Sequence, residues 1–150
     1  EWYALNGYVG NSVPQVDTAK AKTLYTALSK AIAEGLMASC HDCSDGGLGV
    51  ALAETAFAGG LGLKIDLAAV PAEAGMRADE ILFSESQSRF VVTVAPDKAA
   101  AFEEAMAGNV CRKIGEVTGD SMLLVEQNGR QVIKEALVEL KQAWQAPLDF

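Results

Sequence analysis

The sequence lacks several features that would place it in a large class of proteins at once. None of its apolar runs approaches the ~18 residues of a membrane-spanning helix, so we expect no transmembrane segment. Lys and Arg number 12 against 20 Asp and Glu, and the net charge of −8 disfavours nucleic acids and anionic membranes as partners. The opening residues 1–7 are neither basic nor followed by an apolar run, unlike a signal peptide. A start at Glu1 rather than Met indicates a piece of a longer protein.

Cysteine and histidine are also scarce. Three cysteines form no disulfide framework and indicate a reducing compartment, which we take to be the cytoplasm. Cys40 and Cys43 form a C-x-x-C around His41. A redox pair usually opens a helix, whereas the helix expected here begins after both cysteines. A structural zinc site needs four ligands, and the chain offers only three Cys and one His, with Cys111 far away in the sequence. We therefore expect both thiols to be packing residues, one of them facing the core. With a single histidine, Ser44 has no second histidine to activate it, and a lone His at a strand end is more often a hydrogen-bonded structural residue than a base.

Half of the residues are hydrophobic and 14 are glycine, which is typical of a globular chain with many tight turns. Residues 1–150 are predicted to form one domain with an α+β fold, a mixed sheet flanked by helices. Asp17 and Asp97 are the expected caps of two of the helices. After an extended segment over 1–16, the patterns predict helices over 18–34, 46–58, 78–83, 98–107 and from 137 onward, and strands over 36–41, 61–67, 90–94, 111–118, 121–126 and 130–133.

The most informative stretch is residues 41–49, His-Asp-Cys-Ser-Asp-Gly-Gly-Leu-Gly, which we call the 41–49 turn. A strand that ends in Gly46-Gly47 and opens a helix aims backbone N–H groups at one point, which suits a phosphate. Ser44 or Asp45 would be the N-cap of that helix. The alternative is an ordinary strand–helix turn, because neither a Walker lysine nor a GxGxxG pattern follows and an acid beside a phosphate needs a metal ion or a capping role.

A second polar cluster, residues 84–89 (Ser-Glu-Ser-Gln-Ser-Arg), lies between two apolar segments and is called here the polar segment. Arg89 can make a bidentate contact to a phosphate or carboxylate, and Glu85 and Gln87 could meet hydroxyls or a metal. The alternative is a solvated turn in which Glu85 pairs with Arg89.

Taken together, these stretches resemble a known family, phosphoribosylformylglycinamidine synthase. The resemblance rests on the run 39–54 around His-Asp-x-Ser-Asp-Gly-Gly-Leu, and on Leu-Phe-Ser-Glu-Ser-Gln-Ser-Arg-Phe at 82–90. Shorter supporting stretches are Val-Pro-Gln-Val-Asp at 13–17, Glu-Gly-Leu at 34–36 and Ile-Gly-Glu-Val-Thr-Gly-Asp at 114–120. The chain is similar to the last C-domain of that enzyme, an aminoimidazole ribonucleotide synthase-like C-terminal domain. Cys40 and Cys43 stand where the family usually carries small or aliphatic residues, which favours packing for both.

The resemblance implies a large purine-biosynthesis ligase that uses ATP, Mg²⁺ and glutamine-derived ammonia to convert formylglycinamide ribonucleotide to its amidine. The N-terminal domains would hold the catalytic histidine and most nucleotide and metal ligands, so this chain alone would be inactive and would need no cofactor of its own. Its partners would be those N-terminal domains, a glutaminase and a small subunit, or a fused glutaminase. We expect no catalytic residue and no metal ligand here.

The residues expected to bind a ligand or its phosphate belong to the two polar stretches: His41, Asp42, Ser44, Asp45, Gly46, Gly47, Glu85, Ser86, Gln87 and Arg89. In the family, the first C-domain contacts substrate through a Ser-Glu-Ser-Gln stretch, whereas this chain resembles the second copy. Its ligand is then the substrate, an auxiliary nucleotide or none. The alternatives are a non-catalytic scaffold domain, or the C-domain of aminoimidazole ribonucleotide synthase, selenophosphate synthetase or thiamine-monophosphate kinase.

Overall fold

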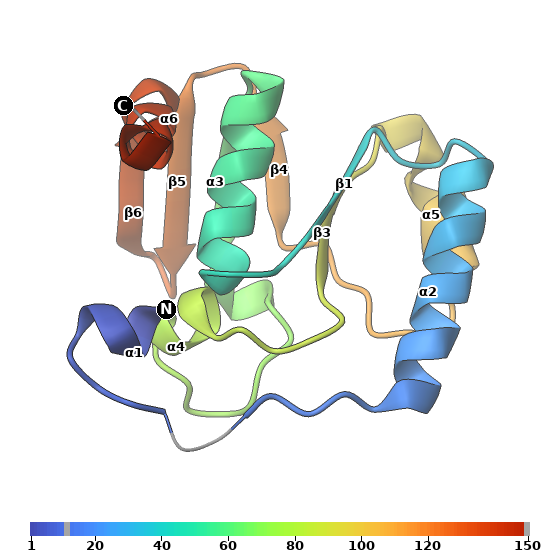
Figure 1. Cartoon of the computed structure of the whole chain (residues 1–150). Helices are drawn as coiled ribbons and strands as arrows, with labels where there is room; N and C mark the ends of the chain where they lie inside the picture. Colours follow the sequence, from blue (N-terminus) through green and yellow to red (C-terminus); the bar gives the residue numbers. More distant parts are fainter. Residues whose placement is uncertain (11–12, 149–150) are drawn as a thin grey trace.

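The computed structural model describes residues 1–10 and 13–148, in which helices and strands alternate along the chain (Figure 1). The helices are α1 (Trp2–Leu5), α2 (Thr18–Ala33), α3 (Gly47–Gly59), α4 (Ala78–Phe83), α5 (Ala99–Ala105) and α6 (Leu137–Gln145), with short 3₁₀ helices at Leu67–Ala69, Pro96–Lys98 and Ala146–Leu148. The strands are β1 (Ser39–Asp42), β2 (Gly62–Asp66), β3 (Phe90–Thr93), β4 (Gly115–Thr118), β5 (Met122–Gln127) and β6 (Arg130–Ala136).

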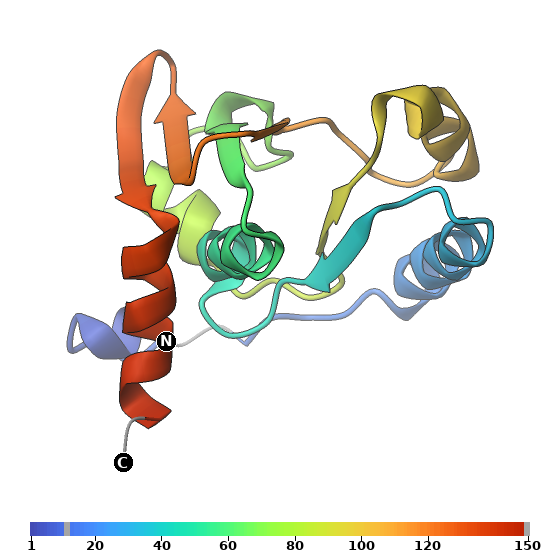
Figure 2. The same cartoon turned by 90° about the horizontal axis from the view of Figure 1, so that it is seen from above.

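The strands form two sheets. Four of them pair in the order β4-β2-β5-β6, with β2 and β5 parallel and the other neighbours antiparallel. The other two, β1 and β3, form an antiparallel pair. Helix α3 covers one face of the four-stranded sheet, and the β1–β3 pair lies to the side of α3 (Figure 2). Both views place α2 and α5 beyond that pair (Figures 1 and 2). The predicted α+β class, with a mixed sheet flanked by helices, is confirmed.

The main core lies between α3 and the four-stranded sheet. Alternate residues of the central strands face it, such as Leu63 and Ile65 on β2 and Leu123 and Val125 on β5. Leu52 of α3 closes the cluster from the helix side. A smaller cluster lies between α2 and α5, and its buried members are Ala31, Phe102 and Met106.

Of the two N-caps predicted at Asp17 and Asp97, one is present in the structure. The Asp17 carboxylate accepts a hydrogen bond from the Lys20 N–H at 3.1 Å, so the predicted cap of α2 is confirmed. The predicted Asp97 cap is wrong, because Pro96–Lys98 form a 3₁₀ helix and α5 begins only at Ala99 without a side-chain cap. Proline favours that tight first turn, since its φ is already fixed near the helical value.

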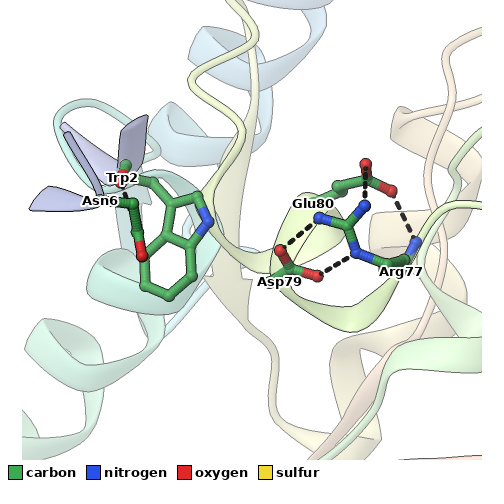
Figure 3. A network of polar contacts seen from close by, with 5 residues as sticks. All are labelled: Trp2, Asn6, Arg77, Asp79 and Glu80. Atoms are coloured by element: carbon green, nitrogen blue, oxygen red, sulfur yellow. Dashed lines mark hydrogen bonds and ion pairs between the residues drawn. The ribbon is translucent and has the colours of Figure 1, made fainter. Parts of the chain in front are cut away.

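The start of the chain and the start of α4 are drawn in Figure 3. Residues 1–16 were expected to be extended, but α1 forms because Trp2 stacks on Phe83, with ring centroids 4.5 Å apart. The Asn6 side chain donates to the Trp2 carbonyl at 2.8 Å. At α4, the Glu80 carboxylate accepts from the Arg77 N–H at 2.8 Å and so satisfies one free donor of the first turn. Residues 11–12 of the expected extended segment lie outside the described part.

Two strands are shorter than predicted. β1 begins at Ser39 rather than 36, because the Leu36 N–H closes the end of α2 by donating to the Ala31 carbonyl at 3.0 Å. β4 covers only Gly115–Thr118, the residues that pair with β2. The hairpin expected around Asn128-Gly129 is confirmed, with β5 and β6 as its strands. None of the helices in the described part of the chain combines the length and the apolar composition that a membrane span requires.

Candidate functional site

The two polar stretches meet at the joint between β1, α3 and α4. His41 and Asp42 end β1 and pair with Val91 and Phe90 of β3. One residue later, the Cys43 N–H donates to the Arg89 carbonyl at 2.9 Å and ties the 41–49 turn to the polar segment. Backbone contacts therefore bring the two polar stretches together.

The first turn of α3 is capped from a distant part of the chain. Its N-cap is Gly46 in the left-handed region (φ 76°), so the predicted caps Ser44 and Asp45 are wrong. Instead, the Glu85 carboxylate accepts the Gly46 N–H at 2.9 Å, and this bond holds the pKa of Glu85 below its ordinary value. The Ser44 hydroxyl donates to the Asp42 carboxylate, while the exposed Asp45 makes no cap. A carboxylate of this chain thus occupies the place where we expected a phosphate.

Gly47 explains why the turn contains a second glycine. It is buried with φ 62°, and a Cβ at this position would overlap the Ser84 carbonyl oxygen and lie 2.9 Å from that of Leu82. The missing side chain lets α3 start directly against the end of α4. Gly47 therefore allows the 41–49 turn to lie directly against the start of the polar segment.

Within the polar segment, Arg89 is turned toward its own backbone. Its guanidinium donates to the Ser86 carbonyl at 3.2 Å and to the Ser84 carbonyl, and among the described residues no ion pair joins it to Glu85. The predicted Glu85–Arg89 pair is therefore wrong, because each group has a backbone partner nearby. The side chains of Ser86 and Gln87 are exposed, and the Tyr25 hydroxyl of α2 lies 2.9 Å from the Ser88 hydroxyl.

His41 is the centre of a network that the sequence did not reveal. Its Nε2 lies 2.6 Å from a Glu54 carboxylate oxygen, and the other oxygen of Glu54 accepts from the Trp144 indole N–H at 2.7 Å. The expectation of a hydrogen-bonded histidine is confirmed, but Glu54 and Trp144 were missed. The available signal was that Glu54 is the one charged residue in α3, an otherwise apolar and polar-neutral helix.

The site is acidic. Besides Glu54 and Glu85, it contains Asp42 and Asp45, and the Ser44 hydroxyl holds the pKa of Asp42 below its usual range. Carboxylates and backbone carbonyls accept hydrogen bonds, so the exposed part of the turn is suited to hydroxyl, amide or ammonium donors. A phosphate here would need a cation between it and these carboxylates.

The cysteines do not form a reactive pair, and the expected packing role is confirmed for Cys43 but is wrong for Cys40. All three are free, Cys43 is buried in the main core, and Cys40 is exposed on β1. Burial raises the pKa of the thiol in each case, which disfavours the nucleophilic thiolate. Within residues 1–10 and 13–148, no cluster of three or more His, Cys, Asp or Glu is placed to hold a metal ion.

Comparison with known proteins places this arrangement in a family. The family model for AIR synthase related protein, C-terminal domain, matches residues 4–126. The chain belongs to this family. The likeness to an aminoimidazole ribonucleotide synthase-like C-terminal domain, first stated from the residues, is thereby confirmed.

Curated relatives of this AIR synthase-related domain are subunits of a larger enzyme. The phosphoribosylformylglycinamidine synthase subunit PurL of Moorella thermoacetica is 39% identical over 144 residues, which is 93% of this chain and 18% of the relative. The PurL subunit of Limosilactobacillus reuteri is 40% identical over 142 residues, 94% of this chain and 18% of the relative. The chain therefore spans about a fifth of the length of these relatives.

Solved structures agree with that assignment. Thermotoga maritima PurL complexed with FGAR matches with a TM-score of 0.78 and 30% identity, over 86% of this chain and 22% of that protein. Hydrogenase maturation protein HypE matches with a TM-score of 0.64 at 17% identity, over 75% of this chain and 41% of HypE, which shows a shared fold alone.

Proposed function

We propose that this chain is the last C-terminal domain of a phosphoribosylformylglycinamidine synthase. That ligase converts formylglycinamide ribonucleotide, ATP and glutamine-derived ammonia to the corresponding amidine. The proposal is supported by relatives of about 39% identity that carry this name and by the matching Thermotoga PurL complexed with FGAR. Because the chain spans only a fifth of such relatives, the activity is assigned to the longer protein and not to these 150 residues alone.

The observation that carries a ligand role is the junction of the two polar stretches. The Gly46–Glu85 and Cys43–Arg89 hydrogen bonds bring the 41–49 turn and the polar segment to one surface. We propose that this surface lines a ligand cleft of the longer enzyme. The proposed lining residues are His41, Asp42, Ser44, Asp45, Gly46, Gly47, Glu85, Ser86, Gln87 and Arg89.

ATP, Mg²⁺ and partner subunits enter this proposal through the longer protein. Thermotoga PurL is described in complexes with ATP, ADP and AMPPCP, and a PurLQS assembly is also described. We assign Mg²⁺ to the longer protein and derive no step through it, since the described residues offer no cluster of metal ligands. The expected partners are the N-terminal domains, a glutaminase and a small subunit, in the cytoplasm, where free cysteines such as these persist.

The deciding experiment uses the intact protein that carries this chain. Phosphate release from Mg²⁺-ATP with ammonia is measured with and without formylglycinamide ribonucleotide. Release that depends on that substrate supports the ligase. Release that depends instead on selenide or thiamine monophosphate would move the function to a sister family and contradict the proposal.

A scaffold role is the second candidate, and one observation favours it. Glu85 and Arg89, the strongest ligand-binding groups of the polar segment, already bond to backbone atoms of this chain. In that case the surface orients neighbouring domains without touching a ligand.

Exposed residues of the polar segment separate the two roles. Gln87→Ala should leave stability within about 0.5 kcal/mol, because the side chain is exposed. If Gln87 contacts the substrate, the substitution raises KM roughly tenfold through the lost hydrogen bond. Gln142→Ala, on the exposed surface of α6, is the matched control. An unchanged KM for Gln87→Ala, together with the same result for Ser86→Ala, would favour the scaffold.

A further inference from the structure

The His41–Glu54–Trp144 network links three elements that are far apart in the sequence. His41 lies near the end of β1 and begins the 41–49 turn, Glu54 lies on α3, and Trp144 lies on the last helix, α6. Glu54 has both oxygens engaged, one by His41 and one by the indole N–H. Phe57, one turn farther along α3, packs against the Trp144 ring at 5.6 Å between centroids. The indole is therefore held by a ring contact as well as by its hydrogen bond.

The contact fixes how protons are arranged on His41. An ionised carboxylate can only accept hydrogen bonds, so the ring nitrogen 2.6 Å from Glu54 must carry a proton. In the neutral ring the proton is then on Nε2, and Nδ1 is an acceptor. Nδ1 lies 3.6 Å from one Asp42 carboxylate oxygen, and the other oxygen of Asp42 accepts from the exposed Ser44 hydroxyl.

His41 Nδ1 and the Asp42 carboxylate are two hydrogen-bond acceptors close to each other. Because the histidine is partly exposed and the aspartate is exposed, they favour a ligand group that donates to both. The titratable groups that face His41 are Asp42 from its own strand and Glu54 from α3, while α6 contributes the neutral Trp144. Every charged neighbour is thus an anion. The pair of His41 Nδ1 and Asp42 is suited to a ligand hydroxyl, amide or amine, and not to a phosphate.

We propose that Glu54 is the positioning residue of His41. Trp144 holds Glu54, Glu54 holds the Nε2–H form of His41, and His41 Nδ1 with Asp42 accepts a hydrogen-bond donor of the ligand. The ligand part rests on the function proposed above. The arrangement of protons does not, because it follows from contacts within this chain.

The first test needs no activity. His41 is the one histidine of the sequence, so the imidazole ¹⁵N signals of the labelled 150-residue chain report it alone. At about pH 8, where histidine is ordinarily neutral, we expect a protonated Nε2 and a bare Nδ1. A protonated Nδ1 in the unsubstituted chain would overturn the proposal without any variant.

Variants test which residues set this tautomer. Trp144→Phe, which keeps an aromatic ring beside Phe57, should weaken the preference for a protonated Nε2. Glu54→Gln should abolish it, because an amide can donate as well as accept. Glu104→Gln, an exposed carboxylate on α5, should change nothing. A tautomer that is unaffected by Glu54→Gln also overturns the proposal.

The second test uses the intact enzyme with formylglycinamide ribonucleotide. We expect Glu54→Gln and His41→Gln each to raise KM roughly tenfold with little change in kcat, as for one lost hydrogen bond. An effect of His41→Gln without one of Glu54→Gln would overturn the positioning role, and an effect of neither would overturn the ligand contact. If the unsubstituted enzyme shows no substrate-dependent phosphate release, the proposed function fails instead, and the ¹⁵N spectrum still decides whether Glu54 positions His41.

Discussion

The two sides of the β1–β3 pair differ in how they are held together. On the α3 side, fully buried residues such as Leu52, Leu123 and Val125 form one continuous core with the four-stranded sheet. On the other side, α2 and α5 meet through a cluster with only Ala31, Phe102 and Met106 buried. The 41–49 turn and the start of the polar segment lie at the better packed side, while Ser88 contacts Tyr25 of α2. The comparison indicates that the proposed site is fixed by the main core, whereas α2 and α5 can open locally.

Breaking the main core should have the largest effect. Leu123→Ala removes a side chain that is 1% exposed and should lower the free energy of unfolding by about 2–5 kcal/mol. Urea denaturation measures this loss. Val132→Ala, on an exposed position of the neighbouring strand β6, is the control and should change stability by less than about 0.5 kcal/mol. Equal losses for the two variants would contradict the assignment of the core.

The second largest loss of stability is expected at Gly47, where α3 starts against the end of α4. Gly47→Ala adds the cost of a left-handed alanine, about 1–2 kcal/mol, and a collision with the Ser84 carbonyl. Gly60→Ala has a similar φ of 67° but no atom within 4 Å of its new Cβ, so it shows the backbone cost alone. Thermal denaturation of both variants should show the larger loss at Gly47. A loss no larger than that of Gly60→Ala would mean that α4 shifts away at little cost.

The outer cluster should respond locally. Phe102→Ala should speed amide exchange in α2 and α5 while the protection of β2 and β5 remains, because these strands belong to the other cluster. Hydrogen exchange followed residue by residue measures the difference. A uniform loss of protection over both sides would show that the two clusters unfold as one unit.

A fall in pH should have the smallest effect on stability, and we expect it to act at Glu85 in the polar segment. The pKa of Glu85 is lowered by the Gly46 N–H, so its stabilisation is present above the pKa of the unfolded chain and is lost as the pH falls through the lower folded value. The urea midpoint should therefore fall between about pH 6 and pH 3, and less so in Glu85→Gln. Glu104→Gln, which is exposed on α5, should lose as much as the unsubstituted chain.

The elements that were predictable are those fixed by local signals. The Asp17 cap and the Asn128-Gly129 hairpin depend on neighbours in the chain, and both were found. The cap of α3 was not predictable, because Glu85 reaches Gly46 only after α4 has packed against the turn. The same holds for α1, which exists because Trp2 stacks on Phe83.

The candidate site shows the same division. Residue types indicated the 41–49 turn and the polar segment, and the structure brings the two stretches into contact. Nothing local indicates that His41, Glu54 and Trp144 meet, because that network needs β1, α3 and α6 in place together. Phosphate binding was inferred from the Gly46-Gly47 turn alone, without the carboxylate that tertiary packing brings to it.

The parallel pairing of β2 with β5 has a consequence for the order in which the chain assembles. Leu63 lies beside Leu123, and α4, β3, α5 and β4 all intervene in the sequence. Closing so long a loop is slow, so the centre of the sheet completes late in folding. During synthesis, the apolar face of β2 must therefore wait until β5 has left the ribosome. A chain that ended before Gln127 would keep this face exposed and would be prone to aggregation.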